Sequence, residues 1–169
     1  MILFRGGLAL LVVLLLGACS SRPKMWHYSY RPGKTAVLVH GKAVPPAGLP
    51  PQVMRAITAG NCIAGLPYKY GGGHRSFVDN GYDCSGAASY VLCAAGALDR
   101  PGTSESLRHF GKSGEGRYIT LYTRKNHHCF LIVAGMRFDT GYNGERKGPQ
   151  WTTRSRPISG YVARHPPGL

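Results

Sequence analysis

The stretch Gly81-Tyr82-Asp83-Cys84-Ser85-Gly86 places a cysteine where a glycine-rich polar segment gives way to an apolar one. Small and aliphatic residues then recur at helical spacing, so Cys84 falls in or just before the first turn of a predicted helix. The free N–H groups and the positive dipole end of a helix start favour a thiolate, and they can lower a thiol pKa from about 8.5 into a reactive range. Cys84 is therefore a candidate nucleophile. The alternative is a small buried thiol, with Asp83 serving only as the helix N-cap.

A thiol that hydrolyses an amide needs a base, a group that orients the base, and donors for an oxyanion. His127 and His128 stand directly before the apolar run Cys129 to Ala134, for which we predict a strand. Because successive side chains on a strand face opposite sides, only one of the two histidines can face Cys84. We favour His128 as the base, since it directly abuts the apolar run.

We predict a turn at Gly135-Met136, and two residues beyond it, Asp139 and Asn143, are candidates for the orienting group. In a two-residue hairpin Asp139 shares the face of His128, whereas Asn143 lies directly opposite His128. We favour Asp139, because a carboxylate accepts a hydrogen bond from the imidazole N–H and stabilises the imidazolium. The alternative is that Asp139 is an ordinary turn or surface carboxylate.

The elements that must position these residues follow from periodicity and from helix-breaking residues. Pro51 suits a first helical turn, and Gly65 with Pro67 ends the helix that it begins. Gly60 inside that helix is unexpected, and Trp151 is expected to serve packing. The predicted helices span residues 51 to about 64, residue 84 onward, and 105 to 110; the predicted strands span 35 to 40, 117 to 122, 128 to 134 and 158 to 163.

The segment Pro67-Tyr68-Lys69-Tyr70-Gly71-Gly72, followed by Asp83-Cys84-Ser85-Gly86, resembles the NlpC family of cell-wall cysteine peptidases. The resemblance covers roughly residues 50 to 163. It implies a papain-like α+β fold, in which N-terminal helices pack on a small antiparallel sheet and the catalytic histidine opens a strand. The family usually has His, Asn or Gln as the third catalytic residue, so the chain departs from it at Asp139.

The resemblance also implies roles beside the nucleophile. Tyr68 matches a tyrosine that lines the site and can help to bind substrate or complete the oxyanion hole. Asp83 and Ser85 match positions that contact the substrate amine in relatives cutting near a free peptide N-terminus, with helix capping as an equal alternative. His74 is expected to be an exposed loop residue.

The N-terminus predicts export. Arg5 precedes an apolar run that is too short for a membrane span, which needs about 20 residues. The residues Leu16-Gly17-Ala18-Cys19 resemble a lipobox, which implies a signal peptide over 1–18, lipidation of Cys19 and the periplasmic face of the outer membrane. Simple secretion is the alternative. We expect a tether and N-terminal extension over residues 19–49, in which the aromatic and basic residues between 20 and about 33 lie on a headgroup surface or pack loosely, and a peptidase domain over 50–169.

Composition limits the partners. The 169 residues carry a net charge of +14, which favours anionic polymers or lipid headgroups. No nucleic-acid motif is evident. The adjacent His127, His128 and Cys129 lack the spacing of zinc ligands, so we expect no metal and no cofactor. We expect a monomer in which Cys62, Cys93 and Cys129 are buried thiols, with one disulfide possible.

Two functions compete. The first is a peptidoglycan hydrolase that cleaves a stem-peptide or crosslink amide through Cys84. The second is a non-catalytic peptidoglycan-binding or scaffold lipoprotein on the same fold, favoured by the irregular third position. An acyltransferase on that fold is a distant third.

Overall fold

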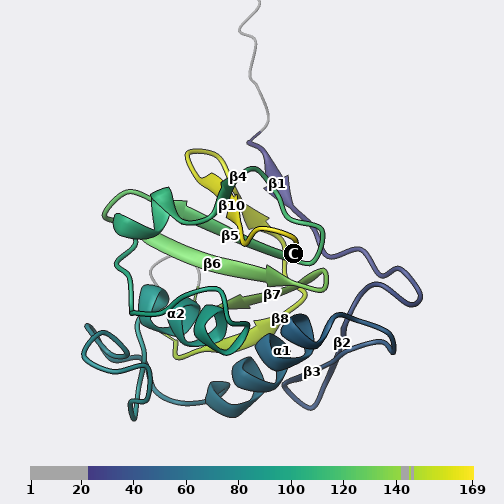
Figure 1. Cartoon of the computed structure of the whole chain (residues 1–169), viewed down its shortest axis with the longest axis horizontal. Coiled ribbons are helices and arrows are strands. Elements are labelled where there is room, and N and C mark those ends of the chain that lie inside the picture. The colour runs from purple at the N-terminus through teal and green to yellow at the C-terminus, as the bar shows by residue number, and fades with distance from the viewer. Residues whose placement is uncertain (1–22, 142–144, 146) are drawn as a thin grey trace, which may run out of the picture.

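The computed structural model describes residues 23–141, 145 and 147–169. Its centre is an antiparallel six-stranded sheet in the order β4-β10-β5-β6-β7-β8, with two helices on one face (Figure 1). The α+β class predicted from the sequence is confirmed. The helices are α1 (Pro51–Ile63), α2 (Cys84–Ala94) and the short 3₁₀ turn η1 (Ser106–His109). The strands are β1 (Met25–Trp26), β2 (Val37–Val39), β3 (Lys42–Val44), β4 (Lys112–Ser113), β5 (Ile119–Arg124), β6 (His128–Val133), β7 (Met136–Asp139), β8 (Gln150–Thr152), β9 (Arg156–Pro157) and β10 (Val162–His165).

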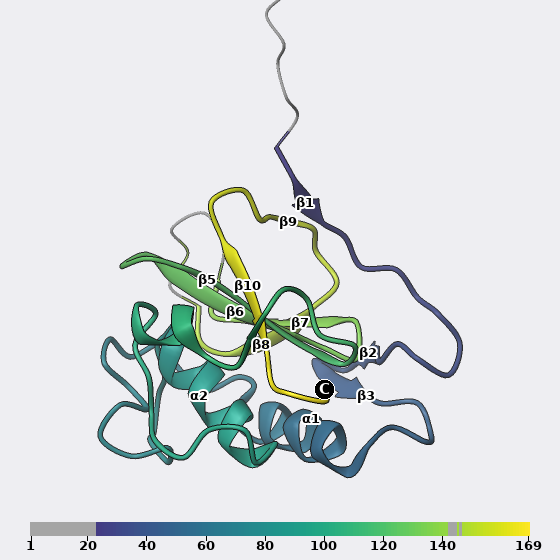
Figure 2. The same cartoon turned by 45° about the horizontal axis from the view of Figure 1, so that its top comes forward.

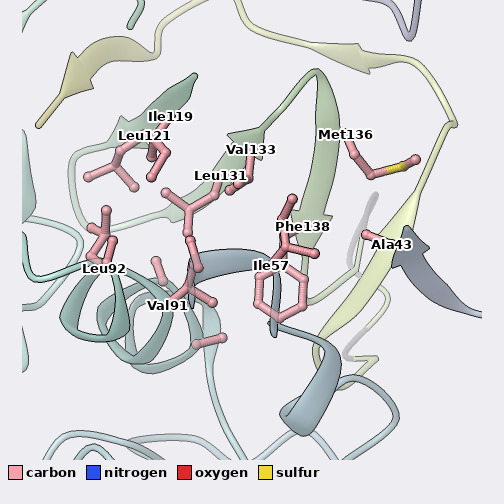
Figure 3. Packing of buried hydrophobic residues seen from close by; sticks show 14 of the residues in the cluster. Ala43, Ile57, Val91, Leu92, Ile119, Leu121, Leu131, Val133, Met136 and Phe138 are labelled. Atoms are coloured by element: carbon pink, nitrogen blue, oxygen red, sulfur yellow. The ribbon is translucent and has the colours of Figure 1, made fainter. Parts of the chain in front are cut away.

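Alternation along β5, β6 and β7 gives the sheet two apolar faces. On one face Leu121, Leu131 and Phe138 pack with Ile57 of α1 and Leu92 of α2 to form the main core (Figure 3). The other face carries a smaller cluster of Tyr122, Phe130, Ile132 and Ile158. In Figure 2 the helices lie below the sheet, and β1 and β9 lie above it.

Helix α1 agrees closely with its predicted span, and its interior glycine has a packing reason. A Cβ at Gly60 would collide with the ring of Trp151, which is buried against Phe138 with ring centroids 4.7 Å apart. Trp151 is thus a packing residue, as expected. The missing side chain lets β8 approach the helix.

The N-terminal segment is more ordered than a tether. Strand β1 pairs with β9, so that Trp26 lies opposite Arg156, and Trp26 packs against the smaller apolar cluster. Strands β2 and β3 form a hairpin whose Ala43 is buried in the main core. The expectation of loose packing is therefore wrong for Met25 and Trp26, whereas contact of the segment with a headgroup surface stays a prediction. The predicted signal peptide 1–18 and Cys19 lie outside the described residues.

The hairpin between β6 and β7 differs from the predicted one. Val133 pairs with Met136, so the turn is Ala134-Gly135 instead of Gly135-Met136, and both turn residues have positive φ (45° and 71°). This is the geometry that two-residue hairpin turns require. The predicted strand over 158–163 is also shifted, because Ile158 to Tyr161 form a turn before β10 begins at Val162.

The expectation of three buried thiols holds for Cys129 and is corrected for Cys62 and Cys93. Cys62, Cys84, Cys93 and Cys129 are all free thiols, but Cys62 is exposed on the outer side of α1 and Cys93 is only half-buried. Within the described ranges no helix combines the length and the apolar character needed to cross a membrane.

Candidate active site

Cys84 is the first residue of α2, as the sequence predicts, and it is only partly exposed. The carboxylate of Asp83 caps the helix by accepting a hydrogen bond from the Gly86 N–H (2.8 Å). The glycine segment packs tightly against this first turn, since a Cβ at Gly86 would collide with the Gly72 carbonyl. The local sequence therefore fixes the thiol at the positive end of the helix.

His128 opens β6 and connects Cys84 to Asp139. Its Nε2 donates a 2.7 Å hydrogen bond to Oδ1 of Asp139, and the side chain of Asp139 is only 1% exposed. The ring also forms a hydrogen bond with the side chain of Cys84. Nucleophile, base and orienting group thus form one chain of contacts.

The electrostatics favour an ion pair between Cys84 and His128. The pKa of Cys84 is lowered to about 4, first by a hydrogen bond from the Cys129 side chain and then, against burial, by His128. For His128, burial lowers the pKa, but the hydrogen bonds to Asp139 and Cys84 outweigh it and raise the pKa to about 9. The site is therefore a thiolate and an imidazolium at neutral pH.

This chain of contacts passes from one face of the sheet to the other. Cys129 lies on the helix-facing side, where its thiol meets Cys84. Asp139 alternates with Phe138 along β7 and so lies on the opposite face, as Phe130 does. His128 is the first residue of β6, and from the end of this strand its ring contacts both Asp139 on one face and Cys84 on the other.

Two arginines flank Asp139 on that opposite face. Nη1 of Arg156 lies 2.8 Å from Oδ2, and Nε of Arg137 lies 3.4 Å from the same oxygen. Both arginine side chains are almost fully buried. A buried carboxylate that also serves His128 is thereby compensated in charge.

Solved structures provide the comparison for this arrangement. NlpC1 from Trichomonas vaginalis is 15% identical over 75% of this chain and 47% of its own, with a TM-score of 0.50. This chain has the NlpC fold. An NlpC/P60 family protein from Bacillus cereus is 17% identical over 67% of this chain and 39% of its own (TM-score 0.49). A hypothetical invasion protein of Mycobacterium tuberculosis is 21% identical over 68% and 62% (TM-score 0.47).

This chain therefore spans between 39% and 62% of the length of these three structures. No protein-family model matches the sequence, and no curated protein matches it. At these identities the likeness concerns the NlpC fold alone.

The remaining predicted residues lie around the nucleophile. Tyr68 is half-buried and forms a parallel bridge with Tyr82, two residues before Cys84. Asp83 and Ser85 are buried beside the thiol, and Nε2 of His74 donates to the Asp83 carboxylate at 3.0 Å. His74 is thus half-buried, contrary to the expectation of an exposed loop residue. Contact of Asp83 and Ser85 with substrate stays a prediction.

The sequence left two alternatives, His127 as the base and Asn143 as the orienting group. His127 is exposed in the turn before β6, where its N–H bonds to the Arg124 carbonyl, and it takes no part in the contacts of Cys84. Asn143 lies outside the described residues. The observed register also removes the reason for choosing it, because continuing the ladder from Leu131–Phe138 sets Gly141 opposite His128.

Sequence reasoning missed Cys129 and Arg156 as members of the site. The sequence predicts Cys129 only as a buried thiol, although its position next to His128 is a signal for a role in the site. No local signal marks Arg156, because its contact with Asp139 joins residues 17 positions apart across two strands. In the part of the chain that the structure describes, no three His, Cys, Asp or Glu side chains group as metal ligands.

Proposed function

We propose that this protein is a cysteine peptidase of the NlpC family that hydrolyses an amide bond in the stem peptide or crosslink of peptidoglycan. The observation that carries the proposal is the contact chain from Cys84 through His128 to Asp139, with the pKa of Cys84 lowered to about 4. A thiolate that is stable at neutral pH is the form of cysteine that attacks a carbonyl.

In the first half of the reaction, the Cys84 thiolate attacks the scissile carbonyl carbon and a C–S bond forms. The carbonyl oxygen becomes an oxyanion, and we propose that the backbone N–H of Cys84 and the hydroxyl of Tyr68 donate hydrogen bonds to it. The C–N bond then breaks as the His128 imidazolium gives its proton to the leaving amine. A thioester on Cys84 and a neutral His128 remain.

In the second half, neutral His128 takes a proton from a water molecule, which attacks the thioester. The C–S bond breaks, and a carboxylic acid product leaves. The thiolate and the imidazolium are restored, so the cycle consumes one water for each amide. Asp139 accepts the hydrogen bond of the ring throughout and stabilises its charged form.

The proposed setting follows from the rest of the sequence. We propose that residues 1–18 are an export signal, that Cys19 carries a lipid, and that the domain acts at the periplasmic face of the outer membrane, with secretion as the alternative. The net charge of +14 suits the carboxylates of the cell wall. We propose that the enzyme acts as a monomer, without metal or cofactor.

The proposal is tested by incubating residues 23–169 with peptidoglycan sacculi under reducing conditions and analysing the released fragments by mass spectrometry. New termini at a stem-peptide or crosslink amide are expected, and they would name the bond. The Cys84→Ser variant should release nothing, whereas Cys93→Ala, which removes a half-buried thiol on the same helix, should digest normally. If the parent pellets with sacculi and releases no fragments, the protein is a binding module instead.

A further inference from the structure

We propose that Arg156 is a positioning residue of this site, one that holds the Asp139 carboxylate in the orientation that His128 requires. The inference rests on the proposed function for its meaning, but its test does not depend on any substrate.

Each oxygen of Asp139 has its own donors. Oδ1 accepts from His128 Nε2 at 2.7 Å and from its neighbour, the Thr140 N–H, at 2.8 Å. Oδ2 accepts from Arg156 Nη1 at 2.8 Å, with Arg137 Nε further away at 3.4 Å. Rotation of the carboxylate would break bonds at both oxygens, so the bond from Arg156 fixes the oxygen that faces His128.

Arg156 is itself held rigidly. Its Nη1 also donates to the Gly141 carbonyl at 2.7 Å, and its Nη2 donates to the Tyr161 hydroxyl at 3.1 Å. The guanidinium lies 4.9 Å from the centroid of the Phe130 ring and 5.9 Å from that of Tyr161. A planar group with several donors satisfies these partners together, whereas a lysine ammonium on a flexible stem cannot.

The backbone around Arg156 adds to this rigidity. Arg156 lies on β9, whose pairing with β1 sets it opposite Trp26. Trp26 in turn lies over Arg137, with 5.9 Å between the guanidinium carbon and the ring centroid. The N-terminal strand therefore covers the arginine side of Asp139 and keeps this ion pair away from water.

The positive charge of Arg156 should also help to keep the pKa of Cys84 low, in addition to its effect on the position of Asp139. Removing its guanidinium leaves Oδ2 of the buried Asp139 with only the more distant Arg137 as a charged partner. It also removes a positive charge from the surroundings of the Cys84 thiolate. Both changes disfavour the Cys84 thiolate. Among the described residues, the ionisable groups that face this network are His128 and Cys129 from β6, Arg137 from β7, Arg156 from β9, Tyr161 from the turn before β10, Cys84 from α2, and Asp83 at the N-cap of that helix.

The test measures the pH dependence of Cys84 alkylation by iodoacetamide in residues 23–169, with the Cys84 peptide quantified by mass spectrometry. In the parent the rate should fall as pH drops through about 4, where the thiolate becomes protonated. Arg156→Gln should move this midpoint upward by about one pH unit, because the imidazolium loses its fixed acceptor. Arg156→Lys keeps a buried cation, folds more readily, and should still move the midpoint by about half a unit.

Arg164→Gln is the matched control. Like Arg156, Arg164 donates to backbone carbonyl oxygens, here those of Phe110 and Gly111, and its loss should leave the midpoint unchanged. A midpoint in either folded Arg156 variant that agrees with the parent within about 0.2 pH unit would overturn the inference.

A double variant separates positioning from a general structural role. Because loss of the guanidinium charge acts on the thiolate with or without the Asp139 carboxylate, Arg156→Gln should still shift the midpoint in the Asp139→Asn background, but by clearly less than in the parent. A shift in that background as large as the one in the parent would show that Arg156 acts through its charge alone and not through Asp139, which contradicts the inference. Because alkylation needs no peptidoglycan, a failed digestion assay would remove the proposed function and leave this result standing.

Discussion

His128 and Asp139 share a 2.7 Å hydrogen bond although they are not cross-strand partners. The ladder pairs Leu131 with Phe138, so continuing it sets Asp139 opposite Phe130, two residues beyond His128 along β6. The contact is a diagonal one on the same face of the sheet. Through this contact an aspartate can orient His128, at a position where the resemblance to the NlpC family leads one to expect His, Asn or Gln.

Replacing the orienting carboxylate should slow hydrolysis. Asp139→Asn keeps the size of the side chain but removes the charge that stabilises the imidazolium, so we expect digestion of sacculi to fall by about 100-fold. The exposed Asp99→Asn provides the control and should digest at the parental rate. A loss of less than about twofold in folded Asp139→Asn would mean that another group orients His128.

The neighbouring thiol should tune the nucleophile. Cys129→Ala removes the hydrogen bond that contributes most to the lowered pKa of Cys84, so that pKa should rise from about 4. The thiolate absorbance near 240 nm, followed during a pH titration, measures this rise. Cys93→Ala serves as the comparison, because that thiol is not among the groups that shift Cys84. An unchanged titration of Cys84 in Cys129→Ala would contradict the assignment.

The pH dependence of digestion should follow the ion pair. The pKa of Cys84 is about 4, so activity should disappear as pH falls through that value and the thiolate is protonated. The pKa of His128 is about 9, so activity should also disappear as pH rises through that value, since the proton for the leaving amine is lost. We expect a plateau between these limits, read as two macroscopic values of the pair. A single rise centred near 6.5, the ordinary value for histidine, would indicate a neutral pair instead.

The N-terminal segment should stabilise the domain. A chain that begins at residue 34 loses β1, its pairing with β9 and the packing of Trp26 against Arg137. We expect the free energy of unfolding to fall by about 1 kcal/mol or more, which should lower the melting temperature by several degrees relative to residues 23–169. Thermal unfolding followed by circular dichroism measures this difference. Trp26→Ala in the longer chain should reproduce part of the effect. Equal melting temperatures would mean that the segment is only a tether.

Much of the fold could be predicted because it depends on local signals. Pro51 and Gly65 bound α1 almost to the residue, and the apolar periodicity after Cys84 fixes the start of α2. The sequence predicts the turn one residue too late, at Gly135-Met136, because alanine seldom adopts the positive φ that Ala134 has in the structure. The conclusion about Asp139 survived this error, since the true register differs by two residues and leaves the face unchanged.

What could not be predicted depends on contacts between distant parts of the chain. The pairing of β1 with β9 involves two residues on each side, too few for any periodic pattern. Arg156 reaches Asp139 only because β9 crosses the far face of the sheet. The position of Cys129 next to His128 is visible in the sequence. Strand alternation, however, puts the two side chains on opposite faces and does not predict that both contact the sulfur of Cys84.

The central claim is that the ion-paired thiolate of Cys84 hydrolyses peptidoglycan. It is tested most directly by treating residues 23–169 with limiting iodoacetamide at about pH 5, where an ordinary thiol is almost entirely protonated. The fraction of Cys84 alkylated is then compared with the fraction of sacculus digestion that is lost. We predict that the two fractions agree one to one. Full alkylation of Cys84 with digestion intact, or a Cys84 that does not react at this pH, would contradict the account.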